Sequence, residues 1–104
     1  MRELQQRVEA FPEDPFWPHA LGLELMSQER WEEAEAAFRE ALRRDPRHHP
    51  THYQLGILYE KLGREAEAIA ILREGMHLAE DARDLALLRD FRSKLVLYLG
   101  LDES

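Results

Sequence analysis

Three histidines near the middle of the chain are the residues whose type and spacing come closest to a chemical site. His48, His49 and His52 lie close together, and imidazoles one helical turn apart can share a divalent ion. Pro50 interrupts the helical spacing between His48 and His52, and no cysteine is present to add a ligand. We expect a turn between two helices here. We therefore predict that this segment is a surface turn and that the chain binds no metal or other cofactor.

The many carboxylates are spaced like those on solvent-facing helices. Glu35 with Arg39 and Glu40 with Arg44 are pairs four residues apart in the favourable order, and each such pair contributes only ~0.2–0.5 kcal/mol. General acid–base catalysis would instead need a carboxylate or histidine held in a cleft. The sequence contains no recognisable nucleophile–base motif and no glycine-rich phosphate loop. We predict that the protein is not an enzyme.

The chain has 104 residues and a formal net charge of −7. This length fits one domain with a sizeable core, and the negative charge repels the phosphates of nucleic acids. No segment approaches the ~20 apolar residues that a membrane span requires. Charged residues such as Arg2, Glu3 and Arg7 interrupt the start of the chain, so we read no signal peptide there. We expect a cytoplasmic protein that binds neither nucleic acid nor membrane.

An internal repeat predicts the elements that position these side chains. Residues of identical type recur thirty-four positions apart, far more often than composition alone would produce. The matched pairs are Leu21 and Leu55, Gly22 and Gly56, Arg30 and Arg64, Glu33 and Glu67, Ala34 and Ala68, Ala36 and Ala70, Arg39 and Arg73, and Glu40 and Glu74.

Each copy reads as two amphipathic helices, because its apolar residues fall at helical intervals. Asp14-Pro15 and Pro50 mark the starts of the first helices, since a first-turn residue does not need its N–H for the helix. Gly63 is placed to end a helix in a left-handed conformation, and Glu29 occupies the matching turn of the first copy. Gly22 and Gly56 lie on the face that the second helix of each copy must approach. We expect these small residues to permit close packing.

These residues resemble the tetratricopeptide repeat pattern. The resemblance rests on Leu21-Gly22, Leu25, Ala34, Phe38, Ala41 and Pro46, and on Leu55-Gly56, Tyr59, Gly63, Ala68, Leu72 and Gly75. It implies an all-α fold, a right-handed α-α superhelix with one helix pair in residues 15–48 and another in 49–82. The sequence departs from the pattern at Pro18, where a large residue is usual and Trp17 is expected to fill the space, and at Glu80, where a closing proline is usual.

The flanking segments complete one predicted domain over residues 1–104. Leu4, Val8 and Phe11 keep the thirty-four-residue register, so residues 1–11 resemble the second helix of a degenerate repeat. Residues 83–99 place leucines along one stripe but lack the Leu-Gly pair. We expect this last helix to cap the stack, since an uncapped repeat would leave an apolar face in water.

The resemblance also implies where a partner would bind. In this family the first helix of each pair lines a concave groove, and such modules hold other proteins or peptides. The corresponding residues are Phe16, His19, Leu23, Met26, Tyr53, Gln54, Ile57, Glu60 and Lys61. They form a mostly apolar strip, which predicts binding of a helix or extended peptide. The sequence equally allows the last helix to cover the strip through Leu87, Phe91 or Lys94.

A second hypothesis is a self-assembling structural unit. Residues 95–99 read Leu-Val-Leu-Tyr-Leu and are apolar on every side of the expected helix, which is more than one packed face can use. The excess could bury against a second copy in a two-fold dimer, the commonest kind of oligomer. The identity of any protein partner cannot be read from the sequence.

Overall fold

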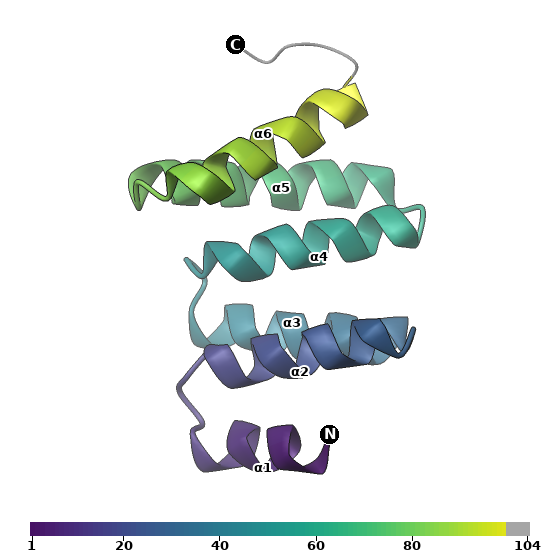
Figure 1. Ribbon diagram of the computed structural model, residues 1–104, viewed down its shortest axis with the longest axis vertical. Coiled ribbons are helices and arrows are strands. Elements are labelled where there is room, and N and C mark those ends of the chain that lie inside the picture. The colour runs from purple at the N-terminus through teal and green to yellow at the C-terminus, as the bar shows by residue number, and fades with distance from the viewer. Residues whose placement is uncertain (100–104) are drawn as a thin grey trace.

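The computed structural model describes the backbone of residues 1–99 and the side chains of residues 1–97, and all regular structure in this part is helical. The six helices are α1 (Arg2–Ala10), α2 (Phe16–Ser27), α3 (Trp31–Arg44), α4 (His49–Lys61), α5 (Glu65–Asp81) and α6 (Leu85–Leu99). They follow one another along the long axis of an elongated molecule measuring 43 × 29 × 19 Å (Figure 1). The predicted all-α helical repeat is confirmed.

The helices pair as the repeat predicts. α2 packs along α3 and α4 packs along α5, so that α2, α4 and α6 lie on the near side of Figure 1 with α3 and α5 behind them. Leu25, Phe38, Leu55 and Tyr59 are buried together in the main apolar cluster, which therefore joins both helix pairs.

Close packing within each pair depends on glycine. A methyl group on Gly22 would lie 2.5 Å from Cε1 of Phe38, and one on Gly56 would lie 2.6 Å from Cγ of Leu72. Both distances are far below van der Waals contact, so a larger residue would force the helices apart. The predicted role of the two glycines is confirmed. A third close approach occurs at Gly75 of α5, where the added methyl group would meet Phe91 of α6.

Three short turns share one backbone geometry. Glu29, Gly63 and Arg83 have φ values of 59°, 74° and 58°. In the first turn the N–H of Arg30 donates to the carbonyl of Leu25 at 2.9 Å, and equivalent bonds close the other two. This is the hydrogen-bond pattern that commonly ends a helix with a left-handed residue. Gly63 adopts it as predicted, whereas Glu29 and Arg83 adopt it despite their side chains.

The end of α5 shows what the missing proline changes. In the first pair, Asp45 is extended (φ −143°, ψ 96°) before Pro46 and α3 ends at Arg44, because a residue that precedes proline is disfavoured in the helical region. With Glu80 at the matching position, α5 continues to Asp81 and turns directly into α6. α6 therefore follows α5 through a tight turn and packs on it.

Arg44 joins the N-terminal helix to the rest of the stack through hydrogen bonds. Its buried guanidinium donates hydrogen bonds to the carbonyls of Val8 at 3.1 Å, Phe11 at 2.9 Å and Asp14 at 3.1 Å. These contacts hold the end of α1 and the connection to α2 against α3.

The predicted packing of Trp17 is wrong. Pro18 is itself fully buried, and Trp17 packs beside Phe11, Phe16 and Arg7 on the side of α1. Trp17 does not fill the space of the residue that usually stands at position 18, because α1 offers its ring a separate contact surface.

Candidate functional site

The outward face of α2 carries the two exposed large apolar residues of the predicted strip. Phe16 is 52% exposed and Leu23 is 39% exposed. They are seven residues apart, about two helical turns, so they lie on the same side of the helix. Met26 on this helix is only partly exposed and packs against the main apolar cluster. α2 therefore presents an apolar surface made chiefly by Phe16 and Leu23.

The α4 part of the predicted strip lies close to α6. The ring of Tyr53 packs edge-on against Phe91, with centroids 5.2 Å apart. The carboxylate of Glu60 accepts a hydrogen bond from the ammonium of Lys94 at 3.1 Å. Leu87 of α6 packs in the same apolar cluster as Tyr53. Two residues named for the covering alternative, Phe91 and Lys94, thus make direct contacts with the strip.

The remaining predicted residues of α4 keep part of their surface. Gln54 and Ile57 are half-buried, and Lys61 is exposed. The nine predicted residues therefore differ in their exposure and in the contacts that they make. We call Phe16, Leu23, Gln54, Ile57 and Lys61 the α2–α4 face. They are the predicted residues that remain when His19, Met26, Tyr53 and Glu60, whose side chains make contacts within the stack, are set aside.

The side chain of His19 makes contacts inside the stack. Its Nδ1 lies 2.7 Å from Oγ1 of Thr51, and Nδ1 of His48 lies 2.7 Å from the same oxygen. Thr51 is completely buried, and the two imidazole centroids are 5.3 Å apart. One hydroxyl therefore bridges two rings and ties α2 to the start of α4.

Burial governs the charge of these rings. It lowers the pKa of His19 to about 4, with a smaller contribution from the neighbouring His48. Burial also lowers the pKa of His48 and of His52. A buried imidazole loses hydration when it is charged, so the folded protein favours the neutral forms.

The other members of the histidine cluster make separate contacts. Nε2 of His49 lies 2.9 Å from a carboxylate oxygen of Asp84 in the turn before α6, and this contact lowers the pKa of Asp84. Nδ1 of the buried His52 donates to the carbonyl of His48 at 3.1 Å. Within the part of the chain that the structure describes, no three histidine, aspartate or glutamate side chains gather in an arrangement that could hold a metal ion.

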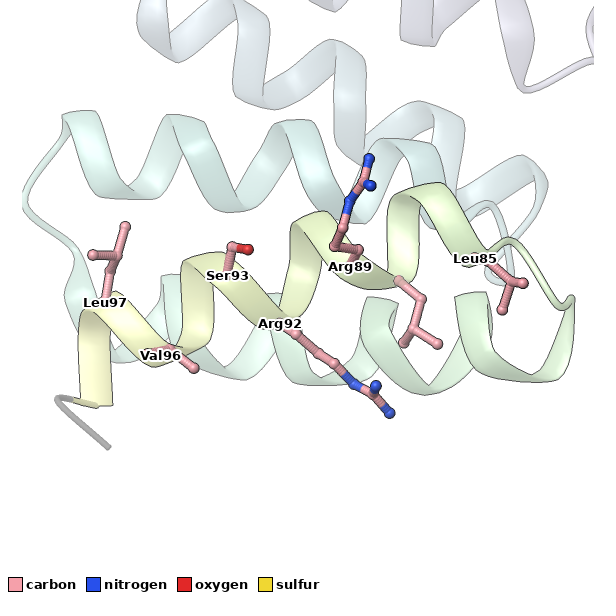
Figure 2. Close-up of a pocket in the computed structure, with 7 residues that line it drawn as sticks. Leu85, Arg89, Arg92, Ser93, Val96 and Leu97 are labelled. Atoms are coloured by element: carbon pink, nitrogen blue, oxygen red, sulfur yellow. The ribbon is translucent and has the colours of Figure 1, made fainter. Parts of the chain in front are cut away.

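A shallow hollow of about 580 Å³ is lined by residues of α6. Figure 2 shows its side chains projecting from that one helix. We call it the α6 hollow, and its lining residues are Leu85, Leu88, Arg89, Arg92, Ser93, Val96 and Leu97.

The apolar residues near the end of α6 differ in their exposure. Leu95 is buried, whereas Val96 is exposed and Leu97 is 76% exposed. The predicted apolar excess at the end of the last helix is therefore present at Val96 and Leu97. The side chains of Tyr98 and Leu99, which belong to the same prediction, lie outside the described residues.

Sequence reasoning missed the Thr51 bridge and the α6 hollow. His19 and Thr51 are separated by a spacing unrelated to the repeat, and their meeting depends on how α2 and α4 lie side by side. The stripe of leucines in α6 was visible, but which leucines face α5 depended on the tight turn at Arg83. Periodicity within one helix carries neither kind of information.

No helix among residues 1–99 is both long enough and apolar enough to cross a membrane.

Comparisons with known proteins agree with this architecture. The family model of the tetratricopeptide repeat matches residues 19–83. A crystal structure of a tetratricopeptide repeat domain protein from Salinibacter ruber is 32% identical, covers 85% of this chain and 98% of its own, and has a TM-score of 0.78. A solution NMR structure of such a domain protein from the same organism is also 32% identical, with 89% and 94% coverage and a TM-score of 0.79. No curated protein matches the sequence. With more than half of its length matched by the family model and the same stacked helix pairs, the chain belongs to the tetratricopeptide repeat family.

Proposed function

We propose that this protein is an interaction module that holds a peptide or helix of another protein against the α2–α4 face. Tetratricopeptide repeats are general protein–protein interaction modules. The observation that carries the proposal is the exposure of Phe16 and Leu23 on one side of α2. Large apolar side chains gathered on an exposed face are typical of partner-binding surfaces.

The chemistry of this face favours a mostly apolar partner segment. Phe16, Leu23 and Ile57 would supply apolar contacts, with Gln54 and Lys61 at the polar edge. The other predicted residues, His19, Met26, Tyr53 and Glu60, would support this face through their internal contacts. The family's best-known carboxylate clamp uses lysine and asparagine where this chain has His19 and Leu23. We therefore expect a segment bound by its apolar side chains and not by a terminal carboxylate.

The exposed area is small, so the contact is expected to be weak. Few large residues take part, and interfaces at the low end of the size range belong to transient encounters. We propose a dissociation constant of about micromolar order, tightened where several copies act together. The proposal includes no catalytic step, because proteins of this family typically do not catalyse reactions, and it keeps the expectation of a cytoplasmic protein without nucleic-acid or membrane partners.

Affinity capture with face-specific variants tests this proposal. Phe16→Glu combined with Leu23→Glu adds charge to exposed positions of α2, and Ala36→Glu adds charge to an exposed position of α3 as the matched control. Proteins that co-purify with the natural chain should be lost with the double variant and kept with the control. If every captured protein remains bound to a folded double variant, the α2–α4 face is not the binding site.

Self-pairing through α6 is a second candidate, supported by the exposure of Leu85 and Leu97 at 73% and 76%. It predicts a doubled mass in light scattering that falls to the monomer value on dilution. A monomeric mass at high protein concentration would eliminate it.

A further inference from the structure

The α6 hollow lies on a helix that is packed on one side only. Phe91 and Leu95 are buried against the stack, while Leu85 and Leu97 are the most exposed large apolar residues described. In the two regular pairs, the first helix is covered by a second helix that packs against Gly22 or Gly56. Within residues 1–99, no helix covers α6 in the same way.

The exposed apolar residues of the hollow follow the spacing that a partner helix needs. Leu85 and Val96 lie eleven residues, about three turns, apart on one side of α6. Leu88, between them, is only 8% exposed and packs mainly in the core. The stripe from Leu85 to Val96 is about 16 Å long at the helical rise per residue. That is room for about three turns of a helix packed along it.

The charged residues of the hollow are both arginines, in a chain whose net charge is −7. Figure 2 shows Arg89 and Arg92 projecting from opposite edges of α6. Their side chains are 78% and 60% exposed, and among the described residues each makes one long ion pair, Arg89 with Asp90 at 4.0 Å and Arg92 with Glu80 at 3.5 Å. Exposed pairs of this kind contribute little free energy, so both guanidinium groups remain available to a ligand.

We propose that the α6 hollow binds an amphipathic helix of another protein whose apolar ridge is bordered by aspartate or glutamate on both sides. The ridge would pack along Leu85 and Val96 and over the small exposed part of Leu88, and its carboxylates would meet Arg89 and Arg92 at the two edges. Hydrogen bonds between guanidinium and carboxylate are charge-assisted and can be bidentate. This site is separate from the α2–α4 face and gives the module a second partner of defined charge.

Charge complementarity selects this occupant over a second copy of the chain. A two-fold pairing of α6 with itself would bring Arg89 and Arg92 of one copy toward the same arginines of the other, and like charges facing each other oppose binding. A second helix of the ordinary repeat type fits poorly as well. Residues 85–97 of α6 contain no glycine of the kind that admits Phe38 or Leu72 in the regular pairs.

Titration of the full-length, ¹⁵N-labelled protein with two designed peptides tests the proposal. Both peptides are capped helices of about fifteen residues with leucines at the same helical positions. One carries glutamate on both borders of the leucine ridge, and the other carries lysine there. The glutamate peptide should shift the amide resonances of residues 85–97 and bind about tenfold more tightly than the lysine peptide, with a preference that shrinks as salt is added.

Charge reversal provides the internal check. Arg89→Glu with Arg92→Glu should reverse the preference in favour of the lysine peptide, whereas Ala36→Glu on α3 should leave it unchanged. If the double variant folds poorly, Arg89→Glu alone takes its place. This single variant retains the Arg92 pair with Glu80 and should reduce the preference for the glutamate peptide. The proposal is overturned if both peptides bind the natural chain equally, if neither binds, or if the shifts centre outside α6. It is also overturned if light scattering shows a dimer of the free protein that Leu97→Glu dissociates, because a second copy would then occupy the hollow.

Discussion

At the scale of single residues, Gly22 and Gly56 set the distance between the two helices of each pair. An added methyl group at Gly22 would overlap the Phe38 ring, which is itself fully buried. We predict that Gly22→Ala lowers the free energy of unfolding by about 1–3 kcal/mol, the usual effect of overpacking a well-filled core.

Urea denaturation measures this change as a lower midpoint at an unaltered slope. Ala20→Gly is a useful comparison, because it removes a methyl group from the same helix without adding one to the contact. If Gly22→Ala is as stable as the natural chain, the close approach of α2 and α3 does not depend on glycine.

The histidine bridge makes stability depend on pH. The pKa of His19 is lowered to about 4 from an ordinary value of 6.5, so between these two pH values the unfolded chain binds more protons than the folded one. Stability is therefore highest above pH 6.5 and falls as the pH decreases toward 4. Lowered pKa values of His48 and His52 act in the same direction, although Asp45 and Asp14 near His48 and Glu74 near His52 oppose part of the effect.

We predict that His19→Gln removes about 1–2 kcal/mol of this pH dependence, a value reduced to allow for the partial exposure of the ring. Urea midpoints measured for both proteins between pH 7 and 4, at low protein concentration, would give the difference. Parallel stability curves for the two proteins would contradict a titrating role of His19.

These residue-scale features differ in how far the sequence could predict them. Gly22 and Gly56 stand out because they recur at the repeat spacing, so their packing role was predictable. The pairing of His19 with Thr51 was not, because it joins two helices through a contact that no periodic pattern marks. His19 was expected on the partner-binding surface because it stands at a groove position of the family pattern, and in the proposal it supports the α2–α4 face from within the stack.

At the scale of elements, the three left-handed turns have a common geometry but different residues. Glu29 and Arg83 hold φ values near 60° with side chains attached, which costs a non-glycine residue roughly 1–2 kcal/mol. Glycine would avoid that cost but has greater freedom in the unfolded chain. We predict that Glu29→Gly raises the free energy of unfolding by about 0.5–1 kcal/mol.

Thermal unfolding of two variants, Glu29→Gly and Gly63→Ala, tests this prediction. The first introduces glycine at a left-handed position, and the second removes glycine from one. An alanine at Gly63 meets no atom within 4 Å, so its expected loss of stability would come from the left-handed backbone alone. A destabilised Glu29→Gly would mean that the Glu29 side chain contributes more than its backbone strain costs.

The helix pattern itself was largely readable from the sequence. Asp14-Pro15, Pro50 and Gly63 marked boundaries that the structure reproduces within a residue or two. α5 extends to Asp81 because Glu80 stands in place of proline. The sequence showed this replacement, but the position of the following helix depended on the next turn. The tight turn at Arg83 then decided which side of α6 remained exposed.

At the scale of the whole molecule, the two candidate surfaces lie on different helices of the stack. The α2–α4 face carries Phe16 and Leu23, whereas the hollow is lined by residues of α6, the last helix along the long axis (Figure 1). The sequence predicted the helices that form both surfaces. It left open whether α6 covers the predicted strip, because a free face and a covered face have the same apolar periodicity. In the structure α6 contacts Tyr53 and Glu60 but leaves Phe16 and Leu23 exposed.

Site-specific photo-crosslinking inside the protein's own cells tests the central claim most directly, since it reports which surface a partner touches. A photoreactive phenylalanine analogue would replace Phe16 on the α2–α4 face, Leu97 in the α6 hollow, or Ala36 on α3, all of which are exposed. We predict adducts with another protein from position 16 and none from position 36. Equal adducts from positions 16 and 36, or none from position 16 while the folded protein crosslinks elsewhere, would contradict a partner-binding α2–α4 face.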